Sequence, residues 1–149
     1  MSESFSTLQE TDFAPFRALN DLPMGMTAHM LFEALDDVPA TLSRTVIDLI
    51  RNDIGFDGLL MTDDIGMKAL SGSCAQISRR ALAAGCDVVL HCNAALKDRA
   101  QSAQAAGRMT DEAQRRAVAA LEARHAPDDI DIADLNAELE ALLGGRLDA

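Results

Sequence analysis

The sequence predicts an α/β fold in which short buried strands alternate with helices. Three nearly continuous apolar runs, at 23–29, 58–62 and 86–91, are each followed by a helical pattern. Runs of this kind are typical of strands in a parallel sheet that is covered on both faces. Gly55 and Gly85 stand just before the second and third runs, which indicates the tight helix-to-strand loop of repeated βα units.

The helices between these runs have recognisable ends. Ser43 is a candidate N-cap, and Gly55 suits the left-handed position after the same helix, with Phe56 folding back on it. The apolar stripe of that helix is formed by Val46, Ile47, Ile50 and Ile54. A second helix, which Gly85 closes, is marked by Ile77, Ala81 and Leu82.

The last third of the chain predicts helices and no strand. Thr110 begins a helix that continues to about Arg124, and the segment 126–129 interrupts it. A final amphipathic helix, stopped by Gly144 and Gly145, has an apolar face of Ile132, Leu135, Leu139 and Leu142. We therefore expect residues 1–109 to form one unit and residues 110–149 to form a helical extension that packs on it.

Three parallel strands do not make a complete sheet in a fold of this kind. A closed (β/α)₈ barrel needs eight strands and roughly 250 residues, whereas this chain has 149. An open three-stranded sheet would leave two bare hydrogen-bonding edges. The sequence therefore predicts part of a TIM barrel, followed by C-terminal helices.

Composition excludes several classes of partner. The net charge is −11 without a basic cluster, which argues against nucleic acid and anionic membranes. Aromatic residues make up 3% of the chain, so the core is aliphatic. The N-terminus lacks the pattern of a secretory signal, and no apolar run is long enough to span a membrane. With three cysteines and no Cys-x-x-Cys pattern, a cytoplasmic protein is expected.

The most informative segment is Thr62-Asp63-Asp64, where the second apolar run ends in two carboxylates. Strand ends are where parallel α/β enzymes place reacting groups. Neighbouring side chains of a strand point to opposite faces, so one aspartate is expected to face the chemistry and the other to bond to backbone or cap a helix. Taken alone, a Thr-Asp-Asp segment after a strand favours a helix cap as the role of Asp63, and the ordered motifs around it reverse that interpretation.

Six ordered motifs resemble the C-terminal half of bacterial β-N-acetylhexosaminidases of glycoside hydrolase family 3, the cell-wall recycling type. The similarity extends from about Phe5 to about Asn93 and continues more weakly beyond. The motifs are Asp12-Phe13-Ala14-Pro15-Phe16-Arg17, Met26-Thr27-Ala28-His29, Pro39-Ala40-Thr41-Leu42-Ser43, Ile54-Gly55-Phe56-Asp57-Gly58, Thr62-Asp63-Asp64-Ile65-Gly66-Met67 and Ala84-Gly85-Cys86-Asp87.

The resemblance implies the last three β/α units of a TIM barrel and a retaining glycosidase that releases terminal β-linked N-acetylglucosamine from muropeptides. It implies Asp63 as the nucleophile. His29, at a strand end, either lines the sugar pocket or only bonds to backbone, and Met67 either contacts the sugar or only packs. No metal and no organic cofactor are expected, and a zinc site at His91 and Cys92 is rejected because no third ligand is evident.

The family's acid/base, a His–Asp pair in a loop upstream of these motifs, has no counterpart in this sequence. We therefore expect the chain to be inactive alone. It would be either half of a split barrel that needs an N-terminal partner chain, or a non-catalytic truncated fragment. A phosphate-binding barrel enzyme is the rival from the same fold. Asp63 and Asp64 argue against it because they would repel phosphate in the loop where such enzymes bind it.

Overall fold

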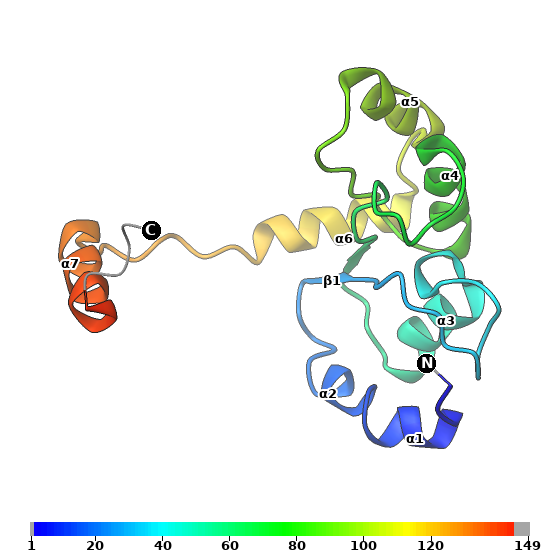
Figure 1. Ribbon diagram of the computed structural model, residues 1–149, viewed down its shortest axis with the longest axis horizontal. Coiled ribbons are helices and arrows are strands. Elements are labelled where there is room, and N and C mark those ends of the chain that lie inside the picture. The colour runs from blue at the N-terminus through cyan, green and yellow to red at the C-terminus, as the bar shows by residue number, and fades with distance from the viewer. Residues whose placement is uncertain (1, 145–149) are drawn as a thin grey trace.

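The computed structural model describes residues 2–144, in which a small parallel sheet is surrounded by helices (Figure 1). The sheet confirms the predicted α/β class. In chain order the elements are α1 (Phe5–Glu10), α2 (Ala14–Arg17), β1 (Met24–Met26), the 3₁₀-helix η1 (Ala40–Leu42), α3 (Arg44–Asp48), the π-helix η2 (Leu49–Asp53), β2 (Leu59–Met61), α4 (Cys74–Ala84), α5 (Leu96–Ala106), α6 (Asp111–Glu122) and α7 (Ile132–Leu143).

The first two apolar runs form the sheet. β1 and β2 pair in parallel, with Met24 opposite Leu59 and Met26 opposite Met61. Both strands are shorter than the runs that predicted them. The crossover between them passes through η1, α3 and η2, as expected for parallel neighbours.

The prediction of a third strand over residues 86–91 is wrong in extent. The run lies beside β2 and forms a single parallel bridge between Met61 and Val88. The amide of Thr62 donates to the Val88 carbonyl at 3.1 Å. One step further, the amide of Leu90 donates to the Thr62 hydroxyl at 3.0 Å. Because a side chain takes this bond, the backbone ladder does not continue.

Local end signals are confirmed at the predicted positions. The Ser43 hydroxyl accepts from the Val46 amide at 3.1 Å at the start of α3. Gly55 and Gly85 have φ of 80° and 115°, which glycine adopts more readily than other residues. The helix after Ser43 is interrupted, since α3 ends at Asp48 and the next turn is the π-helix η2.

The core lies between β2 and the helices around it. Its main cluster joins α1, α3, β2 and α4 and contains Leu8, Phe13, Ile47, Ile54, Phe56, Leu60, Ala81, Ala84 and Cys86. Most of these side chains are aliphatic, as the composition predicted, but Phe13 and Phe56 are buried among them. Burial raises the pKa of the Cys86 thiol to about 12, so this thiol stays protonated and packs as an apolar group.

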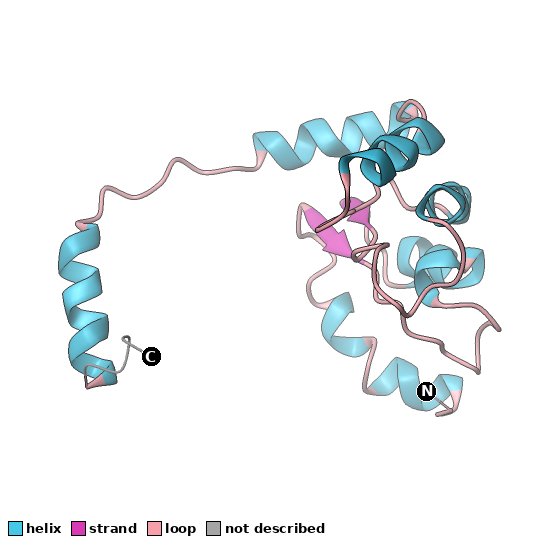
Figure 2. Cartoon of the chain, turned by 45° about the horizontal axis from the view of Figure 1, so that its top comes forward, coloured by secondary structure: helices cyan, strands magenta, loops and turns pink. Residues whose placement is uncertain are grey.

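The C-terminal helices differ in how they relate to the rest. α6 begins at the predicted cap, where the Thr110 hydroxyl accepts from the Ala113 amide at 3.1 Å, and it contacts β2. α7 lies apart from the other elements in both views, and its residues are exposed (Figures 1 and 2). It ends at Gly144, with φ of 62°, while Gly145 lies outside the described residues. The division of the chain at residue 109 stays a prediction.

No helix within residues 2–144 is long and apolar enough to cross a membrane.

Candidate functional site

The candidate site lies at the carboxyl end of β2, where the chain leaves the sheet. β1 and β2 remain joined beyond their last paired residues, because the Asp63 amide donates to the Thr27 carbonyl at 3.2 Å. Thr27 and Thr62 are both buried. Asp63 therefore starts from a fixed backbone position at the edge where side chains of parallel α/β proteins form sites.

The two adjacent carboxylates have different surroundings. Asp63 is half-buried, and its Oδ1 accepts from the Asp64 amide at 2.7 Å. Its Oδ2 receives no hydrogen bond from the part of the protein described here, residues 2–144. One oxygen of Asp63 is thus held by the backbone, while the other has no hydrogen-bond partner within residues 2–144.

Asp64 is turned into the protein backbone instead. Its Oδ1 accepts from the Gly66 amide and from the Cys92 amide, both at 3.0 Å. These two bonds, the Gly66 bond first, hold the pKa of the Asp64 carboxyl below its ordinary value. The side chain therefore stays ionised and joins the loop after β2 to the loop after the third run.

His29 is fully engaged by protein groups. Its Nε2 donates to the Asp64 carbonyl at 3.0 Å, and its Nδ1 lies 2.8 Å from the Thr41 hydroxyl. Thr41 is completely buried, and its hydroxyl also lies 2.9 Å from that of Thr27. Of the two interpretations of His29, the contacts in the structure correspond to the bond with backbone.

Met67 lies one turn beyond the aspartates, and the residue is 46% exposed. Its amide donates to the Asp64 carbonyl at 3.1 Å, the same oxygen that accepts from His29. Asp64 is therefore the residue that connects all three predicted site residues. It bonds to Asp63 through its amide and to His29 and Met67 through its carbonyl.

At the opposite end of the sheet lies an ion-pair network that sequence reasoning missed. Asp87 has a side chain that is 5% exposed, and it pairs with Arg51 at 2.6 Å and Arg116 at 3.0 Å. It also accepts from the Leu60 amide at 2.9 Å. Asp57, just ahead of the second apolar run, and Asp87, near the start of the third, were the available signal. Groups at this end of parallel strands stabilise rather than catalyse.

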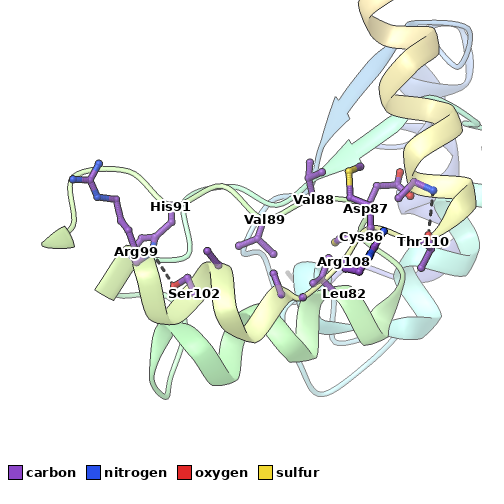
Figure 3. Close-up of a pocket in the computed structure, with 15 residues that line it drawn as sticks. Leu82, Cys86, Asp87, Val88, Val89, His91, Arg99, Ser102, Arg108 and Thr110 are labelled. Carbon is purple, nitrogen blue, oxygen red and sulfur yellow. Dashed lines mark hydrogen bonds between the residues drawn. The ribbon is translucent and has the colours of Figure 1, made fainter. Parts of the chain in front are cut away.

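A cavity of about 500 Å³ opens beside the third run, between it and helices α5 and α6 (Figure 3). His91 Nδ1 lies 3.0 Å from the Ser102 hydroxyl on its wall. The carboxylates of Asp63 and Asp64 do not line it. Nor does the described part of the chain, residues 2–144, contain a group of three or more side chains suited to a metal ion.

The fold and the two aspartates at the end of β2 are typical of α/β proteins in which the loops after parallel strands form the functional site. Residues 1–122 match the family described as Glycosyl hydrolase family 3 N terminal domain. The chain belongs to glycoside hydrolase family 3, which confirms the resemblance seen in its motifs.

Curated proteins similar in sequence to this chain are consistent with membership of this family. The chain is 42% identical over 93 residues to a Beta-hexosaminidase of Alkalilimnicola ehrlichii, a match that covers 59% of this chain and 27% of that protein. The chain thus spans about a quarter of the curated relatives' length.

Solved structures extend the similarity to most of the chain. A family 3 β-N-acetylglucosaminidase from a Paenibacillus strain superposes with a TM-score of 0.70 at 26% identity, over 89% of this chain and 29% of that one. NagZ from Neisseria gonorrhoeae, solved with N-trifluoroacetyl-D-glucosamine, has a TM-score of 0.70 at 24% identity, over 94% of this chain and 40% of that one. The second likeness concerns the fold alone.

Proposed function

We propose that this chain carries the nucleophile half of a retaining β-N-acetylhexosaminidase site, with Asp63 as nucleophile. The observation that supports it best is the contrast between the two aspartates. Asp64 is occupied by two backbone amides, whereas Asp63 Oδ2 is open at the strand end. Attack of this carboxylate on the anomeric carbon would form a glycosyl ester, which water then hydrolyses.

The proposed reaction needs a second group that protonates the leaving oxygen about 5 Å from the nucleophile. Neither neighbour of Asp63 is suited to this task. Asp64 is held ionised, and both ring nitrogens of His29 are engaged by protein groups. We therefore propose that the proton donor comes from residues outside this chain, on an N-terminal partner that completes the barrel.

In this proposal the three described apolar runs are the last three strands of a (β/α)₈ barrel in the cytoplasm. The substrate is terminal β-linked N-acetylglucosamine on muropeptides. His29 positions the Asp63 loop, and Met67, exposed beside it, contacts the sugar. The similarity to a family 3 β-N-acetylglucosaminidase from a Paenibacillus strain, at 26% identity, supports the sugar class.

A second candidate function is a non-catalytic chain of the same lineage. The engagement of His29 and Asp64 favours it, because the chain alone then has no proton donor beside Asp63. The two functions differ in what a complementing half would do. Restored activity supports the catalytic proposal, and a stable but inactive complex supports the non-catalytic one.

The test is hydrolysis of a nitrophenyl N-acetyl-β-glucosaminide and of a natural N-acetylglucosaminyl disaccharide. We expect no turnover of the disaccharide by the chain alone, because an alkoxide must then leave unprotonated, and residual activity only on the nitrophenyl substrate. Adding the N-terminal part of the Alkalilimnicola ehrlichii relative should restore turnover of both. Hydrolysis of the disaccharide by the chain alone, lost in Asp63→Asn, would contradict the need for a partner.

A further inference from the structure

The helix α7 has an apolar face that nothing within residues 2–144 covers. Ile132, Leu135, Leu139 and Leu142 follow one another at intervals of three and four residues, the spacing of a helix face that packs against another surface. All four are exposed, from 45% for Leu139 to 78% for Leu142. α7 has 12 residues, and isolated helices of this length are marginal in water. The helix therefore needs a surface to pack on.

The segment that contains α7 is strongly acidic. Residues 126–144 include no lysine or arginine, and their acidic side chains are Asp128, Asp129, Asp131, Asp134, Glu138 and Glu140. None of these forms an ion pair within residues 2–144. Glu138 stands three residues after Leu135 and four before Leu142, so its carboxylate borders the apolar face. The surface that suits α7 is apolar, with positive charge at its rim.

The cavity of about 500 Å³ beside the third run has these properties (Figure 3). Two arginines line it, Arg99 in the first turn of α5 and Arg108 two residues after the end of that helix. Neither guanidinium makes a hydrogen bond or an ion pair within residues 2–144. The apolar part of the wall contains Leu82, Val88, Val89, Ala103, Ala106 and Met109. In a chain with a net charge of −11, unpaired arginines beside an apolar hollow indicate a surface for an acidic amphipathic partner.

The other polar side chains of this cavity already have partners. The Asp87 carboxylate is paired with two arginines that do not line the cavity. His91 Nδ1 lies 3.0 Å from the Ser102 hydroxyl, and the Thr110 hydroxyl caps α6. Arg99 and Arg108 are therefore the charges that remain for a ligand.

The hollow of about 270 Å³ beside β1 suits α7 less well. Its lining contains exposed apolar residues such as Phe16 and Met26 but no charged residue. It offers apolar contact without a charge to pair with the carboxylates of α7. Charge complementarity therefore favours the cavity beside α5.

The position of α7 identifies the copy whose cavity it fills. The start of α6 lines the cavity, whereas the end of α6 leads to α7, far from it (Figures 1 and 2). To reach its own cavity, α7 would have to fold back along the 12 residues of α6, a length of about 18 Å. To reach the cavity of a second copy, it needs no rearrangement. A reciprocal exchange about a two-fold axis covers both helices and both cavities.

We propose that two copies of this chain form a dimer in which α7 of each copy lies in the cavity of the other, against the third run, α5 and α6. Leu139 and its apolar neighbours enter the cavity. The carboxylates of α7, Glu138 foremost, pair with Arg99 and Arg108 at its rim. The dimer requires neither the barrel nor the chemistry of the proposed function.

Light scattering of the full chain should show a dimer that dissociates on dilution. Raising the salt concentration from about 0.05 M to about 0.5 M should weaken it several-fold, because ion pairs at an exposed rim are screened. Hydrogen exchange should be slower in α7 above the dissociation midpoint than below it. These measurements do not involve catalysis, so they can fail or succeed independently of the proposed function.

Charge reversal tests the pairing. One variant carries Arg99→Glu and Arg108→Glu, and a second carries Glu138→Arg and Glu140→Arg. Each variant alone should dimerise about tenfold more weakly or worse, because like charges then meet at the rim. An equimolar mixture should dimerise as the natural chain does, since each α7 then meets a cavity of opposite charge.

Arg79→Glu with Arg80→Glu is the matched control. It makes the same change in net charge on α4, at exposed positions outside the cavity lining, and should leave the dimer unchanged. Leu139→Ala should weaken the dimer about tenfold through lost apolar contact, while alanine preserves the helix. Circular dichroism should show native helix content in every variant.

Three results would overturn the proposal. The first is a chain that stays monomeric at hundreds of micromolar, whether or not α7 is protected from exchange. The second is a mixture of the two reversed variants that dimerises no better than either one alone. The third is a control variant that weakens the dimer as much as reversal at Arg99 and Arg108 does.

Discussion

His29 and Asp64 are joined by a hydrogen bond of 3.0 Å, in which the ring Nε2 donates to the backbone carbonyl across 35 residues of sequence. On its other side the ring lies 2.8 Å from the Thr41 hydroxyl. Thr41 thus orients His29, and His29 holds the loop that carries Asp63. The nucleophile candidate is therefore positioned by a chain of contacts that begins in the buried segment η1.

Replacing Thr41 by valine should destabilise the chain, because the size is retained while His29 Nδ1 and the Thr27 hydroxyl lose their partner. We expect a loss of about 1–3 kcal/mol in the free energy of unfolding, measured by urea denaturation. Thr41→Ser keeps the hydroxyl and is the control. Equal losses in both variants would indicate that packing, not the hydrogen bond, is what matters.

Asp63→Asn should lower the activity of the complemented enzyme by more than about 1,000-fold, because an amide is not a nucleophile toward the anomeric carbon. Asp64→Asn should retain part of the activity, because its amide oxygen can still accept from Gly66 and Cys92. Initial rates on the nitrophenyl substrate measure both. Greater loss from Asp64→Asn would mean that the other carboxylate reacts.

Stability should fall in acid. The pKa of Asp64 is lowered by its backbone amide partners, and that of Asp57 is lowered first by the hydrogen bond from Arg116. A carboxyl whose folded pKa lies below its unfolded value of about 3.9 contributes stability above that value and loses it as pH falls through the folded pKa. Denaturation midpoints should be level between pH 5 and 7 and drop below about pH 4. Asp64→Asn should make this drop smaller.

Removing the buried charge of Asp87 should be far more costly than removing an exposed one. In Asp87→Asn the partly buried Arg51, with a side chain 14% exposed, loses its ionic partner, and we expect a loss of about 3–5 kcal/mol. Asp48→Asn breaks the exposed pair with Arg44 and should cost at most about 0.5 kcal/mol. Thermal and urea unfolding compare the two, and similar values would show that the Asp87 network is not a structural anchor.

The sequence by itself determined the ends of helices and the strand runs. Ser43, Gly55, Gly85 and Thr110 act within a few residues of their own position, through a cap bond or a positive φ, so their effect could be predicted locally. α5 was missed because most of its residues are small or polar and it buries only Ser102. Without an apolar stripe, its helical conformation has no clear periodic signal.

The tertiary structure decided how the strand ends are used. Which aspartate is engaged depends on the Cys92 amide, 28 residues away, and the partners of His29 come from two other segments. The third run does not continue as a strand because the Thr62 side chain accepts the Leu90 amide in place of a backbone carbonyl. Asp87 pairs with Arg51 and Arg116, which are 36 and 29 residues away in the sequence. Contacts of this kind follow from how elements pack in space, and residue types and periodicity do not specify them.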